Sequence, residues 1–304
     1  MGQMDIGIPE TALRERPAPV VVRRPPVQTV PVVFASPHSG RIYSPEFLAA
    51  ARLDPLSLRR SEDSFVDELF VDAPLYGAPL LTAHFPRAWC DVNREPWELD
   101  PAMFEDALPD WVNSASPRVG AGLGTIARVV ATGEAIYRRK LRFAEAEARV
   151  RECWQPYHET LAALIGGTRA TFGACLLIDC HSMPACAGAR GAADFVLGDA
   201  HGTACAPAIT RAVEQTLAAM GYSVRRNDPY AGGYITRHYG RPRENVHALQ
   251  LEVARPLYMD EGRIQKLVRF SALQRAISNL VSDITERAAS LMGDPCAGGV
   301  PRSS

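Results

Sequence analysis

Several side chains capable of metal binding or proton transfer stand at or near the ends of short apolar runs in this sequence. His38 comes just after one such run. Asp179 and His181 end a second run, and Glu252 lies within a third. Imidazoles and carboxylates are ligands that Zn²⁺ takes in proteins, and a further carboxylate could move a proton during hydrolysis. These residue types could therefore bind a divalent metal and activate a water molecule.

Each of these positions also has a simpler interpretation. A histidine in a Ser-Pro-His-Ser-Gly segment, as His38 is, is more often a solvated loop residue. Glu252 could be a buried carboxylate bonded to an arginine. The pair Asp179 and His181 is more informative, because residues two apart lie on the same side of an extended strand. Asp179 could then orient the ring of His181 or of a neighbouring ligand.

The segment from Arg87 to Arg94 concentrates polar side chains in an otherwise apolar stretch. It contains two arginines together with Asp91 and Asn93. A guanidinium binds a carboxylate through two parallel hydrogen bonds, and an Asn side chain adds a directional donor. The segment is therefore typical of a site that recognises an amino-acid-like substrate.

Two glycine-rich segments supply further candidates for lining a pocket, namely His201, Tyr234, Thr236 and His238. Glycine permits tight turns and loop closure, so these segments could cover a substrate. The remaining histidines, His84, His158 and His247, are expected to be packing or surface residues.

The elements that must position these residues alternate between short β-branched runs and longer segments of helical period, which indicates an α/β fold. Such sheets bind ligands beyond the carboxyl ends of their strands, where these positions could converge. The predicted strands are Val30–Ser36, Pro79–His84, Ala88–Val92, Ala174–Asp179, Asp194–Leu197 and Val246–Val253. Helices are predicted after Ser44 and Asp54, over 134–165 with an interruption at Pro156, and along the stripe Phe270, Leu273, Ile277, Leu280 and Ile284.

Composition and charge narrow the classes of function. The 304 residues have 33 Lys+Arg against 34 Asp+Glu, a net charge of −1 that disfavours nucleic-acid or anionic-membrane binding. Seven cysteines without CxxC spacing argue against a disulfide framework, and no apolar run approaches the roughly 18 residues of a spanning helix. We expect a cytoplasmic protein with one catalytic domain at 30–292, a flexible N-terminal arm at 1–29 and a flexible tail at 293–304.

Six motifs in this order resemble those of the N-formylglutamate amidohydrolase family. They are SPHSG, EDSFVDELF, RAWCDVNREP, IDCHSMP, DFVLGD.HG and the stretch from GGYITRHYG to VHALQLEVARPLYMDE, and they span Val30 to Asp260. That family is distantly similar to zinc carboxypeptidases and aspartoacylase. The resemblance implies a single-domain, three-layer α/β/α fold with a mixed, mostly parallel central sheet of about eight strands.

The resemblance also implies roles for particular residues. His38 and His181 would bind zinc, and Glu252 would be the general base. Asn93 and Arg94 would bind the substrate carboxylate, and Arg87 would stabilise the oxyanion.

One departure concerns the third metal ligand. The carboxypeptidase-like pattern has a Glu three residues after the first His, whereas this sequence has Arg41 there. We expect Asp63 to replace it, with the adjacent Glu62 as the alternative. Asp91 and Asp179 are expected to support the ligands from behind, and His201, Tyr234 and Thr236 to contact the substrate.

The resulting hypothesis is zinc-dependent hydrolysis of a small N-acyl amino acid, with N-formyl-L-glutamate as the leading substrate. One Zn²⁺ per chain is expected, although another divalent ion would suit the same ligands. The alternatives are hydrolysis of another carboxylate-bearing amide or short peptide, and a non-catalytic metal-binding sensor or assembly protein. A serine hydrolase is disfavoured because the sequence has no GxSxG elbow. A role in histidine catabolism is implied by the resemblance alone, and the sequence leaves homo-oligomerisation open.

Overall fold

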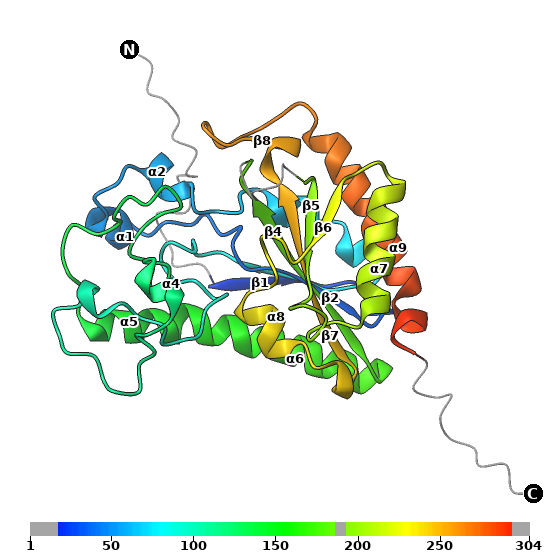
Figure 1. The fold of residues 1–304 in the computed structure, drawn as a ribbon, viewed down its shortest axis with the longest axis horizontal. Helices are drawn as coiled ribbons and strands as arrows, with labels where there is room; N and C mark the ends of the chain where they lie inside the picture. The colour runs from blue at the N-terminus through cyan, green and yellow to red at the C-terminus, as the bar shows by residue number, and fades with distance from the viewer. Residues whose placement is uncertain (1–17, 186–192, 294–304) are drawn as a thin grey trace, which may run out of the picture.

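The computed structural model describes residues 18–185 and 193–293, in which a seven-stranded mixed sheet lies between layers of helices (Figure 1). The strand order is β1-β3-β2-β4-β7-β5-β6. The strands are β1 (Val20–Arg23), β2 (Val32–Ser36), β3 (Leu80–Ala83), β4 (Cys175–Met183), β5 (Phe195–Gly198), β6 (Val224–Arg226) and β7 (Val246–Ala254). The predicted α/β class is confirmed, with seven strands in place of about eight.

Four neighbouring strands, β3, β2, β4 and β7, run parallel to one another. Within this seven-stranded sheet, as far as the structure describes it, the antiparallel pairs are the flanking ones, β1 with β3 and β5 with β7. Because parallel strands end at the same edge, residues after β2 and at the ends of β4 and β7 meet there. The sheet topology therefore brings together the segments that the sequence singled out.

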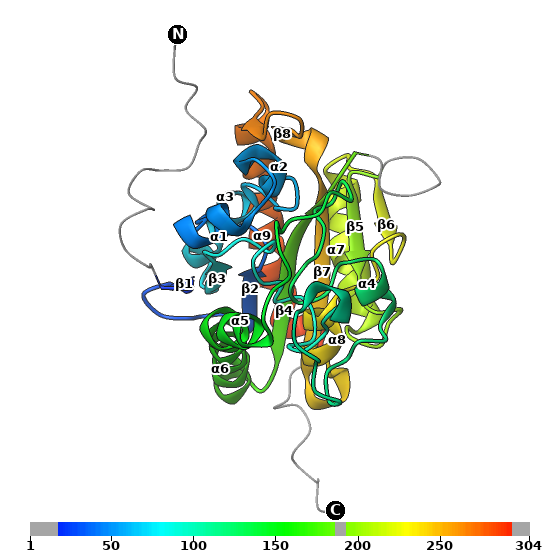
Figure 2. The ribbon, with the colours of Figure 1, turned by 90° about the vertical axis from the view of Figure 1, so that its left-hand side faces the viewer.

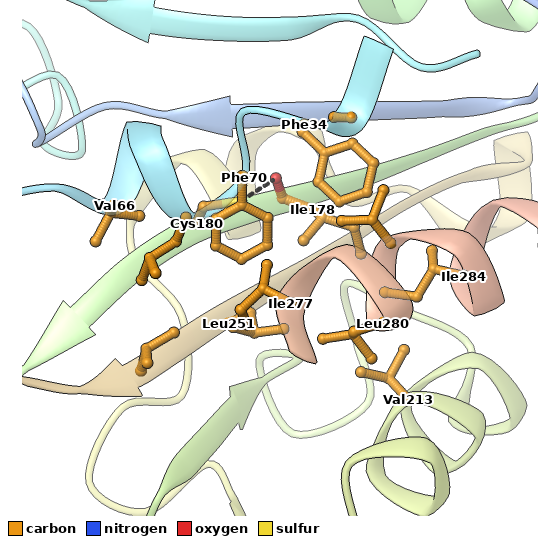
Figure 3. Packing of buried hydrophobic residues seen from close by; sticks show 14 of the residues in the cluster. Phe34, Val66, Phe70, Ile178, Cys180, Val213, Leu251, Ile277, Leu280 and Ile284 are labelled. Carbon is orange, nitrogen blue, oxygen red and sulfur yellow. Dashed lines mark hydrogen bonds between the residues drawn. The ribbon is translucent and has the colours of Figure 1, made fainter. Parts of the chain in front are cut away.

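Alternate residues of the central strands face opposite helix layers, as the two-residue period requires. Phe34 and Ile178 pack with α9 (Phe270–Met292) and α7 (Pro207–Ala219), and Figure 3 shows this cluster around Ile277 and Leu280. Val33 and Leu177 face α6 (Gln155–Phe172) on the other side. The predicted stripe of α9 is buried along its length, which confirms that helix.

The helix predicted over 134–165 is one helical rod that begins later and contains a π-helical turn. It consists of α5 (Phe143–Arg149), the π turn η4 (Val150–Trp154) and α6. Pro156 follows the π turn by two residues, and the rod continues through it without the expected interruption. In Figure 2, turned by 90° from Figure 1, α5 and α6 lie on one side of the sheet and α7 on the other.

The strand predicted at Ala88–Val92 is wrong. The backbone N–H groups of Trp89 and Cys90 both donate to the carbonyl of Pro86, so the chain turns there. The N–H of Asp91 donates to the carbonyl of Thr125, which lies in a separate loop. These local bonds replace the ladder that a strand would need.

The N-terminal arm was predicted too long. Val20–Arg23 form β1 and pair with β3 in the register Val20 to Ala83, which explains the β-branched run at 20–22. Residues 1–17 and the tail after Gly293 lie outside the described residues.

Short elements complete the chain. The predicted helices after Ser44 and Asp54 are confirmed as α1 (Pro45–Ala50) and α2 (Pro55–Arg59), each capped by that side chain. The others are α3 (Val66–Leu69), η2 (Ala73–Tyr76), η3 (Pro101–Met103), α4 (Pro117–Gly120), α8 (Tyr234–Tyr239), η5 (Pro242–Glu244), η6 (Arg255–Leu257) and the hairpin β8 (Met259–Asp260) with β9 (Gln265–Lys266). Within 18–185 and 193–293, no helix combines the length and apolar character needed to cross a bilayer.

Candidate active site

A cavity of about 640 Å³ opens where β4 and β7 end. His181 and Ser182 line it from β4, and Glu252 lines it from β7. Its walls come from residues 59–64 at the end of α2 and after it, from the segment that contains Arg87 and Arg94, from the loop 123–132 and from the turn 259–264. The cavity therefore occupies the edge of the sheet where ligands bind in open α/β folds.

At the base of this region, His38, Asp63 and His181 form a buried cluster. One ligand atom from each residue lies within 4.8 Å of the others. Oδ2 of Asp63 is 3.0 Å from Nδ1 of His181 and 3.4 Å from Nδ1 of His38. The three side chains are at most 3% exposed. The structure thus brings Asp63 to the two histidines, as the sequence analysis expected.

The ring of His38 is oriented by Asp91. Nε2 of His38 lies 2.8 Å from Oδ1 of Asp91. Burial raises the pKa of Asp91, but Arg87 and His38 outweigh it and lower that pKa well below its usual range. An ionised carboxylate only accepts, so Nε2 carries the hydrogen and Nδ1 keeps its lone pair. Within the described part of the chain this buried Nδ1 has no hydrogen-bond partner.

His181 also has a carboxylate, Asp179, beside its ring, although neither oxygen of Asp179 has a hydrogen bond within the described part of the chain. Nε2 of His181 is 3.0 Å from Oδ2 of Asp179, and Nδ1 faces Asp63. Burial lowers the pKa of His181, but the carboxylates of Asp179 and Asp63 outweigh it and raise that pKa well above its usual value. In the absence of a metal cation the cluster therefore attracts a proton. This preference for positive charge is what a divalent cation would satisfy.

The two oxygens of Asp63 have separate environments. Oδ1 accepts from Ser182 Oγ and from Arg255 Nη2, each at 3.1 Å. Oδ2 is left facing the imidazoles. Although burial acts to raise the pKa of Asp63, its hydrogen bond with His181 and its closeness to His38 lower that pKa well below its usual range. The residue is therefore an anionic donor with one oxygen directed at the cluster.

Glu62, the alternative ligand, points elsewhere. Its carboxylate accepts from Tyr43 OH at 2.8 Å, from Ser64 Oγ at 2.7 Å and from Arg59 Nε at 3.1 Å. These hydrogen bonds hold the carboxylate of Glu62 within the wall of the cavity.

The cluster fits a divalent metal by its chemistry. Two imidazole nitrogens and one carboxylate oxygen form a catalytic zinc donor set, which leaves further positions for water or substrate. A carboxylate behind each histidine is the usual support for such ligands. The structural observation that supports this fit is the buried Nδ1 of His38, which has no hydrogen-bond partner among the described residues.

Glu252 stands beside the cluster, because its register partner on β4 is His181. Gln250 Nε2 donates to Oε1 of Glu252 at 2.8 Å. Burial raises the pKa of Glu252 to about 7, with His181 acting in the opposite direction. A carboxylate with such a pKa can accept a proton and return it near neutral pH.

Both predicted arginines line the cavity. Nη2 of Arg87 donates to Oδ2 of Asp91 at 2.7 Å. Arg94 donates from Nε to the carbonyl of Leu123 at 2.8 Å and from Nη1 to the carbonyl of Asn93 at 2.9 Å. Among the residues that the structure describes, Nη2 of Arg94 has one distant charge partner, Oδ2 of Asp91 at 3.9 Å.

Four other predicted substrate contacts lie outside the cavity lining. Asn93 uses its amide internally, since Oδ1 accepts from the N–H of Ile235 at 2.8 Å and Nδ2 lies 3.3 Å from Nε2 of His181. Thr236 is fully buried, Tyr234 stacks on the ring of His238 with centroids 4.8 Å apart, and His201 is exposed at a positive φ of 57°. The glycine-rich segments serve mainly to turn the chain and support Asn93.

Arg60, Tyr230 and Arg255 also line the cavity and were missed by the sequence analysis. Arg255 follows β7 by one residue, so the rule that sites gather at strand ends could have found it. Tyr230 precedes the glycine pair Gly232–Gly233, a weaker signal. Nothing in the sequence distinguishes Arg60 from surface arginines.

Fold and site together define an α/β protein with a cluster suited to metal-assisted hydrolysis. The model of the N-formylglutamate amidohydrolase family matches residues 30–259, and the chain therefore belongs to that family.

Comparison with individual proteins agrees with this family membership. The chain is 34% identical over 240 residues to the N-formylglutamate deformylase of Pseudomonas aeruginosa, covering 76% of this chain and 83% of that protein. It is 30% identical over 239 residues to the enzyme of the same name from Pseudomonas putida, with the same coverage. Among solved structures, it resembles an N-formylglutamate amidohydrolase from Ralstonia eutropha with a TM-score of 0.85 and 38% identity, covering 90% and 99% of the two chains.

Proposed function

We propose that the protein hydrolyses N-formyl-L-glutamate to formate and L-glutamate with one divalent metal ion per chain, Zn²⁺ being the ion that suits the donors best. The observation that carries the proposal is the buried cluster of His38, Asp63 and His181 beside Glu252, at the base of an arginine-lined cavity. Membership of the family and the names of the relatives supply the substrate.

The metal would be bound by His38, Asp63 and His181, and when bound it would supply Lewis acidity toward the formyl carbonyl and lower the pKa of water. Glu252 accepts a proton as water attacks the formyl carbon. It then returns that proton to the amide nitrogen as the C–N bond breaks. Arg87, fixed by Asp91, donates to the oxygen that becomes negative.

The charges along the cavity suit a dicarboxylate. One terminal nitrogen of Arg94 has no close partner in the described part of the chain, and Arg94 is proposed to bind one carboxylate of the substrate. Arg60, the residue after α2, also lines the cavity. Its side chain forms no ion pair or hydrogen bond with any described residue. We assign it to the second carboxylate, because a partly buried guanidinium gains most from an anion that arrives with the ligand.

A substrate panel on metal-replete protein tests the proposal. Formate release from N-formyl-L-glutamate should exceed release from N-formyl-L-alanine, which lacks the second carboxylate, by at least about tenfold in kcat/KM. Removal of the metal with a chelator should abolish turnover, and addition of Zn²⁺ should restore it. Absence of formate release from N-formyl-L-glutamate by the metal-replete protein would refute the proposed activity.

A further inference from the structure

The backbone on either side of Asn93 is held by two side chains from the helical rod beneath it. Trp154 Nε1 donates to the carbonyl of Arg94 at 3.0 Å. His158 Nε2 lies 2.8 Å from the carbonyl of Val92. The segment 92–94 is irregular in structure, so it has no sheet ladder to fix it. These two bonds therefore constrain its orientation.

The tautomer of His158 follows from its partners. A carbonyl can only accept, so Nε2 must carry the hydrogen. Nδ1 then accepts from the hydroxyl of Tyr239, which lies 2.9 Å away. Burial lowers the pKa of His158 to about 4, so the ring is neutral at ordinary pH. The donor toward Val92 is thus present without protonation of the ring.

The π turn places both side chains under the segment. Trp154 is the last residue of η4, and His158 lies in the first turns of α6. Their ring centroids are only 3.9 Å apart, so the two rings form one support. Insertion of a π turn changes the face on which following residues lie, and such turns are frequent at functional sites.

The support is coupled to the guanidinium of Arg94. Nη1 of Arg94 donates to the carbonyl of Asn93, within the same segment. A movement of this backbone would therefore shift the guanidinium relative to the cavity. His158 and Trp154 do not line the cavity themselves, so any effect on substrate must pass through the segment.

We propose that Trp154 and His158 are positioning residues that orient Arg94 for binding of a substrate carboxylate. This inference rests on the proposed function, since it concerns the residue assigned there to the substrate. It predicts an effect on KM for a carboxylate-bearing formyl amide with little effect on kcat.

A double-mutant cycle tests the coupling. Trp154→Phe keeps the ring and removes the N–H, and should raise KM for N-formyl-L-glutamate about fivefold while kcat stays within about twofold. In an Arg94→Ala background the same change should have no further effect on KM. Glu159→Gln, an exposed neighbour on α6, is the matched control and should leave both constants unchanged.

Two variants of His158 provide a second test of the same inference. His158→Gln can still present an N–H toward Val92 and should retain a KM near wild type, whereas His158→Leu cannot and should raise it. If Trp154→Phe raised KM equally in the wild-type and Arg94→Ala backgrounds, Trp154 would have a general packing role, and the inference would be wrong. Wild-type protein inactive on N-formyl-L-glutamate would instead overturn the proposed function, and this inference with it.

Discussion

Nε2 of His38 lies 2.8 Å from Oδ1 of Asp91, and the opposite ring nitrogen faces Oδ2 of Asp63 at 3.4 Å. The same Asp91 also accepts from Arg87 and from the backbone N–H of Asn93. One carboxylate thus connects the proposed metal ligand to the proposed oxyanion donor.

Asp91→Asn is expected to weaken metal binding about 10- to 100-fold, because an amide can present its NH₂ to His38 and favour the wrong tautomer. Competition with a chromophoric chelator measures the change. Asp54→Asn, at the exposed cap of α2, is the control and should not alter affinity for the metal. Unchanged affinity in Asp91→Asn would contradict the supporting role.

Asp63→Asn and Glu62→Gln should separate the two acidic neighbours. Asp63→Asn removes the anionic donor between the histidines, so metal content should fall from about one ion per chain to near zero. Glu62→Gln should keep the metal, although it disturbs bonds to Tyr43 and Arg59 and should lower stability. Elemental analysis decides between them, and loss of metal only in Glu62→Gln would transfer the ligand role.

Glu252→Gln should lower kcat at least about 100-fold with metal content unchanged, since an amide cannot accept the proton. Glu261→Gln, another carboxylate of the cavity lining, should retain most activity. In wild type, kcat/KM should decrease as pH falls, because protonated Glu252 is inactive as a base. Burial sets its pKa at about 7, and a bound cation lowers it, so the acid limb should lie at or below about pH 7. Normal turnover by Glu252→Gln would exclude it as the base.

Arg94→Ala and Arg60→Met should both act on substrate binding. Each is expected to raise KM for N-formyl-L-glutamate at least about tenfold, the usual effect of losing a hydrogen bond to a charged group. With N-formyl-L-alanine, Arg60→Met should lose almost nothing, because that substrate lacks the second carboxylate assigned to Arg60, whereas Arg94→Ala should still raise KM. Arg52→Met, an exposed arginine, is the control. If each variant raised KM equally for N-formyl-L-glutamate and N-formyl-L-alanine, the assignment of the second carboxylate to Arg60 would be wrong.

His158 should make stability depend on pH. Burial lowers its pKa from 6.5 to about 4, so below pH 6.5 the unfolded chain takes up a proton that the folded protein does not. This contribution is complete above pH 6.5 and decreases as pH falls toward 4, by about 2 kcal/mol at pH 5. Urea unfolding at about pH 7.5 and pH 5 should show that His158→Gln loses less stability than wild type over this interval. An identical loss in the two proteins would show that His158 is not the group responsible.

Several features of the fold and site follow from the sequence alone. The continuous apolar run 174–179 predicted a buried strand and the stripe of α9 predicted a helix; both elements form, and the strand continues to Met183. Asp179 and His181 share one side of β4, because the backbone alternates. The motifs between Val30 and Asp260 are sufficient to identify the family.

Other features depend on contacts between residues far apart in the sequence. The sequence analysis assigned Ala88–Val92 to a strand, but the bond from the N–H of Asp91 to the carbonyl of Thr125 and the bond from Arg94 Nε to the carbonyl of Leu123 fix this stretch as an irregular segment. Adjacent acidic residues are equivalent in sequence, and only the neighbours in space turn Glu62 toward Arg59 and Asp63 toward His181. Local pattern predicts the long, strongly patterned elements, because it reflects backbone geometry and burial. The direction in which each polar side chain points is decided by its hydrogen-bond partners, which only the tertiary structure brings together.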